Sequence, residues 1–117
     1  MDKLDQEFGK HYLIEMIECD SEKIKFVESV RQTMLRAAEK SNATILKHFF
    51  HQFKPTGVSG IVVIAESHLS IHTWPEKNYA AIDIFTCGKM DIKTVLDEFK
   101  KGFNAKQATY TIIPRGF

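Results

Sequence analysis

The sequence predicts an α+β protein in which two amphipathic helices cover one face of a mainly antiparallel sheet, a two-layer α/β sandwich. Two segments carry apolar residues at three- and four-residue steps, the spacing of a helix with one buried face. Several shorter segments alternate with a period of two, as strands do. No linker or low-complexity segment divides the 117 residues. Residues 1–117 are therefore expected to form a single domain.

The two helices are predicted from their caps and their apolar faces. Asp20 and Ser21 are N-cap residues in front of one long amphipathic segment that extends to about Ser41. Asp91 caps the second segment, whose apolar face contains Ile92, Val95, Leu96, Phe99 and Phe103. Since each helix has a single apolar face, both can pack on the same side of one sheet.

Six segments are predicted as strands. They are residues 11–18, 43–53, 58–66, 67–73, 79–87 and 107–113. The β-branched run at 58–66 is expected to be buried on both faces. The side of the sheet away from the helices would hold many aromatic and histidine side chains. It must face water or pack on another surface, which is a first indication of oligomerisation.

Composition and charge exclude several classes of protein. The content of 44% apolar and 26% charged residues is that of a globular chain. A formal charge of +1 gives no electrostatic reason to expect a nucleic-acid or membrane-surface partner. A domain this small also has little room for an enclosed active site. An enzyme of this size is therefore expected to use walls from a second copy.

The cysteines and the N-terminus indicate a cytoplasmic protein. Cys19 and Cys87 have no zinc-ligand or disulfide spacing, which suits a reducing compartment. Residues 1–7 are polar and acidic, unlike a signal peptide. The apolar run at 60–65 is too short to span a bilayer.

Hydroxyl, imidazole and carboxylate groups are concentrated between residues 53 and 76. His68 and His72 are four apart, which would make a metal pair on a helix, but the alternation and Pro75 favour a strand, so no metal site is expected. A serine nucleophile with a histidine base is admissible, because Ser70 shares the parity of both imidazoles, yet no Gly-x-Ser-x-Gly elbow is present. By spacing alone, the default interpretation is that these residues are polar positions on a half-buried sheet face.

Two longer motifs narrow the choice. Residues 57–76, GVSGIVVIAESHLSIHTWPE, and residues 79–88, YAAIDIFTCG, closely resemble the bacterial and archaeal S-adenosylmethionine decarboxylases. A weaker resemblance at residues 9–11 and 114–116 extends it over nearly the whole chain. Two positions differ from the Ser and Thr usual in that family, Ala65 and Ser70.

The resemblance implies a self-processing proenzyme that makes a covalent pyruvoyl cofactor from Ser67. The Ser67 hydroxyl would attack the Glu66 carbonyl in an N-to-O acyl shift. Elimination would then leave residues 1–66 as the β chain and 67–117 as the α chain. His72 matches the family's proton acceptor in processing, a role that suits an imidazole near neutral pH. Ser59 matches a position that assists processing by hydrogen bonding to the oxyanion.

The same resemblance implies how catalysis proceeds. The substrate amine would form a Schiff base with the pyruvoyl carbonyl, which serves as an electron sink for loss of carbon dioxide without any external cofactor. Cys87 matches the residue that then protonates the α-carbon, and a thiol suits this because surroundings can tune its pKa. Cys19 lies outside the motifs and is interpreted as a buried structural residue.

Substrate contacts and assembly are also implied by the resemblance. Phe53 matches a position that stacks on adenine, and Glu76 one that accepts hydrogen bonds from the ribose hydroxyls. Trp74 would line the pocket or belong to the core. The family assembles as a homodimer of processed protomers, two α and two β chains, with active sites near the interface between paired sheets.

The implied function is decarboxylation of S-adenosylmethionine to the aminopropyl donor for spermidine synthesis. One alternative is a pyruvoyl-dependent arginine or ornithine decarboxylase, which would have no need of Phe53 and Glu76. Another is a non-catalytic regulatory paralogue. Against that alternative, the chain has Ser67, His72 and Cys87 together.

Overall fold

The computed structural model describes residues 6–87 and 89–117 and has strands and helices in the expected order. The elements are β1 (Glu7–Ile17), α1 (Ser21–Ile24), α2 (Val27–Lys40), β2 (Thr44–Gln52), β3 (Val58–Ala65), β4 (Ser67–Trp74), the 3₁₀ turn η2 (Pro75–Lys77), β5 (Tyr79–Thr86), α3 (Ile92–Gly102) and β6 (Gln107–Gly116).

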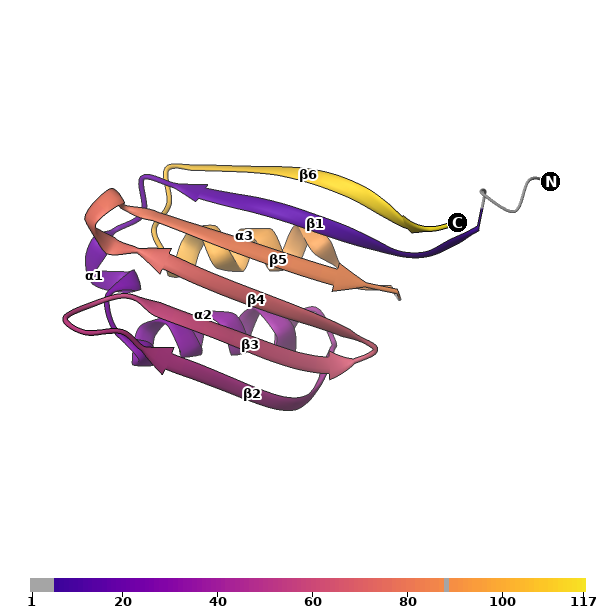
Figure 1. Ribbon diagram of the computed structural model, residues 1–117, viewed down its shortest axis with the longest axis horizontal. Coiled ribbons are helices and arrows are strands. Elements are labelled where there is room, and N and C mark those ends of the chain that lie inside the picture. Colours follow the sequence, from indigo (N-terminus) through magenta and orange to yellow (C-terminus); the bar gives the residue numbers. More distant parts are fainter. Residues whose placement is uncertain (1–5, 88) are drawn as a thin grey trace.

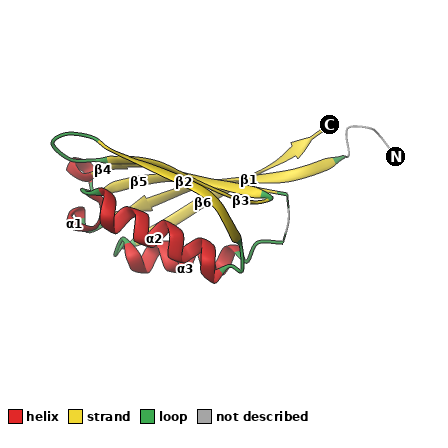
Figure 2. Cartoon of the chain, turned by 90° about the horizontal axis from the view of Figure 1, so that it is seen from below, coloured by secondary structure: helices red, strands yellow, loops and turns green. Residues whose placement is uncertain are grey.

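The strands form one sheet in the order β2-β3-β4-β5-β1-β6, and each neighbouring pair is antiparallel. The helices lie on one side of this sheet and leave the other side uncovered (Figure 2). The predicted α+β two-layer sandwich is therefore confirmed. We call the uncovered side the open face and the other the helix face.

The core lies between the helices and the helix face, and both layers contribute to it. The two phenylalanines of the α3 region, Phe99 and Phe103, are fully buried, with ring centroids 6.3 Å apart. They pack in a core that also contains Ile14, Met34, Leu69 and Ile82. This continuous apolar layer fixes the sheet against the helices.

The first helical segment differs from the prediction, because the single helix expected over residues 21–41 is two helices. Phe26 adopts an extended conformation, with φ −125° and ψ 151°, and separates α1 from α2. The side chain of Gln52 holds this break: its Oε1 accepts from the Val27 N–H at 2.7 Å, and its Nε2 donates to the Lys25 carbonyl at 2.9 Å. The predicted caps at Asp20 and Asp91 are confirmed, since Asp20 accepts from the Glu22 N–H and Asp91 from the Thr94 N–H, whereas Ser21 is the first residue of α1.

The expectation that the β3 segment is buried on both faces is wrong for the single chain. Val58, Val62 and Ile64 are buried on the helix face, but Ile61 and Val63 on the open face are 40% and 37% exposed. The reason is that α2 and α3 lie on the same side of the sheet. Within the described residues, no helix combines the length and apolar character of a membrane span.

Candidate active site

A tight turn joins β3 to β4 at one end of the sheet. Ile64 and Ser67 are paired across it, so only Ala65 and Glu66 form the turn. On its other side Ser67 is paired with Thr86 of β5, and its Oγ donates a hydrogen bond to Thr86 Oγ1 at 3.0 Å. The Ser67 hydroxyl is thus fixed on the helix face, where Thr86 is 6% exposed.

Cys87 follows β5 directly and reaches the same turn. Its thiol donates a hydrogen bond to the Glu66 carbonyl oxygen, with 2.7 Å between Sγ and O. The carbonyl of Glu66 and the hydroxyl of Ser67 belong to adjacent residues. Thr86 contacts the Ser67 side of the peptide bond between them, and Cys87 contacts the Glu66 side. We call Glu66, Ser67, Thr86 and Cys87 the processing turn.

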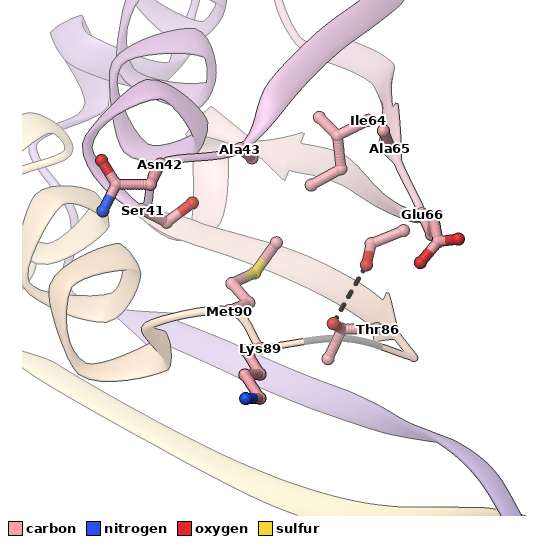
Figure 3. Close-up of a pocket in the computed structure, with 10 residues that line it drawn as sticks. Ser41, Asn42, Ala43, Ile64, Ala65, Glu66, Thr86, Lys89 and Met90 are labelled. Atoms are coloured by element: carbon pink, nitrogen blue, oxygen red, sulfur yellow. Dashed lines mark hydrogen bonds between the residues drawn. The ribbon is translucent and has the colours of Figure 1, made fainter.

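A cavity of about 160 Å³ adjoins the processing turn (Figure 3). Its wall continues over Ser41–Ala43, the loop after α2, and over Lys89 and Met90 after β5. Ligand sites for drug-sized molecules are roughly 300 Å³ or larger. The single chain therefore offers room here for only part of such a ligand.

A second cluster lies on the open face at the other end of the sheet. Ser59 on β3 is paired directly with His72 on β4. The His72 ring has its centroid 5.4 Å from that of Phe53 and 4.3 Å from that of Trp74. We call Ser59, His72, Phe53 and Trp74 the His72 cluster.

Glu76 belongs to the same end of the molecule as the His72 cluster. It is exposed on η2, two residues after Trp74. A Cβ atom placed on Gly57 would lie 3.8 Å from both Phe53 Cβ and Pro75 Cδ, so the β2–β3 turn and η2 adjoin. The three residues expected to contact substrate, Phe53, Trp74 and Glu76, are thus neighbours.

The processing turn and the His72 cluster are far apart in one chain. Ser67 and His72 are five residues apart on β4, about 17 Å at the usual rise of a strand. They also differ in parity, so Ser67 lies on the helix face and His72 on the open face. The β3–β4 turn and the β2–β3 turn are at opposite ends of the sheet (Figure 1). A single chain therefore brings Ser67 and Cys87 together, but neither His72 nor Ser59 reaches them.

Two groups at the sheet were not singled out from the sequence. One is Thr86, the single hydroxyl among the helix-face positions of β5, which otherwise carry Ala80, Ile82 and Ile84. The alternation of the sequence already shows this signal, because Thr86 is a polar residue at a position where the strand otherwise has apolar ones. The other is Asp83 on the open face, whose carboxylate lies 3.1 Å from His11 Nε2 and accepts from Ser70 Oγ at 3.4 Å.

Comparisons with known proteins identify the family. A family model described as S-adenosylmethionine decarboxylase matches residues 10–116. Over 109 residues the chain is 49% identical to the S-adenosylmethionine decarboxylase proenzyme of Thermotoga petrophila, covering 92% of this chain and 84% of the relative. It is 45% identical to the proenzyme of Thermococcus kodakarensis, covering 92% and 76%. The chain belongs to the S-adenosylmethionine decarboxylase family.

A solved member of the family has the same fold. The crystal structure of the adenosylmethionine decarboxylase from Aquifex aeolicus matches with a TM-score of 0.86 and 33% identity, covering 96% of this chain and 93% of that one. The resemblance found in residues 57–76 and 79–88 is confirmed. Both the processing turn and the His72 cluster lie inside the segment that the decarboxylase family model matches.

Proposed function

We propose that this protein is a self-processing S-adenosylmethionine decarboxylase. It cuts its own chain between Glu66 and Ser67 into residues 1–66 and 67–117 and then converts S-adenosylmethionine to the aminopropyl donor for spermidine synthesis. Family membership supports the reaction, and the relatives named above are proenzymes. The observation that carries the proposal is the hydrogen bond from the Cys87 thiol to the Glu66 carbonyl, next to the Ser67 hydroxyl.

The first step of processing is an acyl shift at the processing turn. Ser67 Oγ attacks the carbonyl carbon of Glu66, the new C–O bond replaces the C–N bond to Ser67, and the hydroxyl proton ends on the freed amine. Negative charge develops on the Glu66 carbonyl oxygen during the attack. A donor already directed at that oxygen stabilises this charge without reorganisation, and the Cys87 thiol is such a donor.

The second step breaks the chain. A base removes the Cα proton of Ser67, the Glu66 carboxylate leaves from Cβ, and water converts the resulting dehydroalanine to a pyruvoyl group with loss of ammonia. We assign the base to His72, because imidazole exchanges protons near neutral pH. Ser59, its cross-strand neighbour, assists the preceding acyl shift as a hydrogen-bond donor at the oxyanion.

Because Ser67 and His72 are at opposite ends of β4, processing requires a second copy of the chain. A two-fold axis across the strands places the His72 cluster of one copy opposite the processing turn of the other. Burial of the open face is favourable, since Phe49 is 66% and Ile61 40% exposed there. The proposed working assembly is a homodimer of two α and two β chains.

The residues of the processing turn fit a pyruvoyl cofactor at the N-terminus of the α chain. Ser67 is the residue type from which the group can form, and it is half-buried beside a cavity. The group supplies a carbonyl that accepts electrons as carbon dioxide leaves the substrate. Cys87, at the same turn, is placed to deliver a proton to the substrate α-carbon, and thiols transfer protons readily near neutral pH.

The His72 cluster and η2 provide the substrate contacts. Phe53 is 38% exposed, which leaves its ring available to stack on adenine. Glu76 is exposed and can accept hydrogen bonds from a ribose diol. We assign Trp74, whose ring lies against that of His72, to the wall of the same site. Arginine or ornithine as substrate, and a regulatory role without catalysis, are not favoured, because the relatives named above are S-adenosylmethionine decarboxylase proenzymes.

A carbon dioxide release assay tests the proposal. Carboxyl-labelled S-adenosylmethionine, arginine and ornithine are supplied in parallel to the purified protein and to Ser67→Ala. We expect release from S-adenosylmethionine by the unaltered protein alone. Release from arginine or ornithine only would contradict the assigned substrate. No release from any of the three compounds would contradict the proposed decarboxylase activity.

A further inference from the structure

We infer that Thr86 is a positioning residue for the Ser67 nucleophile during self-cleavage, an inference that rests on the proposed function. The Ser67 hydroxyl donates to Thr86 Oγ1 at 3.0 Å. Thr86 accepts this bond from a buried position on β5, directly across the β4–β5 ladder from Ser67.

Thr86 is the one polar side chain on the helix face of β5. The other helix-face positions of β5 are Ala80, Ile82 and Ile84, all buried. A buried hydroxyl is unfavourable unless it is hydrogen-bonded, and the Ser67 hydroxyl is one of the groups that bond to Thr86. The Thr86 hydroxyl lies at the strand position paired with Ser67, which points to a role in positioning Ser67.

The other buried threonine on the neighbouring strand shows what a structural role looks like. Thr73 on β4 accepts from the Val58 N–H at 3.0 Å and donates to the Ile24 carbonyl at 2.8 Å. It links backbone groups of separate elements. Thr86 directly precedes Cys87 in the sequence, and the Thr86 hydroxyl accepts from the side chain of Ser67, the group that reacts.

The hydrogen bond selects the orientation that Ser67 needs for attack. A serine side chain has three staggered rotamers, and only some direct Oγ to the preceding carbonyl carbon. Donation to Thr86 holds the Ser67 proton away from Glu66 and leaves the oxygen lone pairs for the carbonyl carbon. Holding the reacting atoms in place removes part of the entropic barrier.

Thr86 and Cys87 therefore act as a pair on the two halves of one reaction. Thr86 orients the nucleophile, and Cys87 donates to the oxygen that becomes negative. Thr86 gains no proton over the whole acyl shift, because the Ser67 proton ends on the amine released from Glu66. Its effect is confined to the formation of the ester.

The test measures the rate of cleavage at Glu66–Ser67 in freshly synthesised chain by intact mass. Thr86→Val removes the acceptor and preserves shape, and we expect it to slow cleavage about tenfold or more. Thr86→Ser restores the hydroxyl and should be within about threefold of the unaltered chain. Thr33→Val makes the same change at another buried threonine, on α2 and away from the turn, and should cleave normally. Thr86→Ala is a second hydroxyl-free variant if the valine variant does not fold.

Hydroxylamine separates ester formation from elimination, because it cleaves the ester directly. We expect the hydroxyl-free variants to remain slow in hydroxylamine. The inference is overturned if they cleave at the normal rate, if hydroxylamine restores that rate, or if Thr86→Ser is as slow as they are. If the unaltered chain itself stays intact, the proposed function fails and this inference with it; normal cleavage of both the unaltered and the hydroxyl-free chains removes only the role of Thr86.

Discussion

The thiol of Cys87 donates a hydrogen bond to the carbonyl oxygen of Glu66, with 2.7 Å between the two atoms. This contact joins the residue proposed as proton donor in catalysis to the bond proposed to be cut. One side chain would thus serve first in maturation and then in turnover.

The two roles of Cys87 can be separated by substitution. Cys87→Ser keeps a donor at the Glu66 carbonyl, so cleavage should stay within a few-fold of normal, but a hydroxyl is a poor proton donor near neutral pH and turnover should fall at least about a hundredfold. Cys87→Ala should slow cleavage about tenfold as well. Cleavage is followed by intact mass and turnover by carbon dioxide release. Full turnover by the serine variant would remove Cys87 from the catalytic step.

The distance between Ser67 and His72 predicts complementation between chains. Ser67→Ala and His72→Ala should each fail to cleave alone. When the two are co-expressed, half of the dimers are mixed and each holds one intact site, so about a quarter of normal activity should appear. Mixing two chains that both carry Ser67→Ala is the control. Absence of cleavage on co-expression would contradict a site built from two copies.

The two cysteines should differ sharply in reactivity. Burial raises the pKa of the Cys19 thiol to about 11, and its Sγ donates to the Met16 carbonyl at 3.5 Å. Cys19 therefore remains a protonated thiol below that pH, whereas Cys87 is exposed. Iodoacetamide at about pH 8 should alkylate Cys87 first, as measured by peptide mass mapping. Equal labelling in the folded protein would contradict the burial of Cys19.

Gly60 allows close contact between two strands. It is paired with Phe50 of β2, and a Cβ atom at Gly60 would overlap the Phe50 ring. Gly60→Ala should lower the free energy of unfolding by about 1–3 kcal/mol, the usual cost of overpacking. Urea unfolding measures this, with Phe50→Leu in the same background expected to recover part of the loss. An unchanged unfolding midpoint would show that the Phe50 ring moves freely.

The fold was predictable because its elements have clear local patterns. The alternation within 79–87 and the cap at Asp91 locate β5 and α3 within one or two residues. The break at Phe26 was not predictable, since it depends on Gln52, a side chain from a distant strand. The last strand also continues past Ile113 through Pro114 to Gly116, because β6 is an edge strand and pairs only with β1.

The candidate site was predictable in part. The motif from Gly57 to Glu76 identifies the residues, and strand parity already places Ser67 and His72 on different faces. The contacts of Thr86 and Cys87 were not predictable, because they depend on the β4–β5 register. That register is a property of the folded sheet rather than of either segment alone.

The most direct test of the account is the intact mass of the purified protein. We expect two chains, residues 1–66 and residues 67–117, with the second lighter by one ammonia than simple hydrolysis would make it. Ser67→Ala should give one chain of 117 residues. An unaltered protein that also remains a single chain of 117 residues would contradict self-cleavage at Glu66–Ser67.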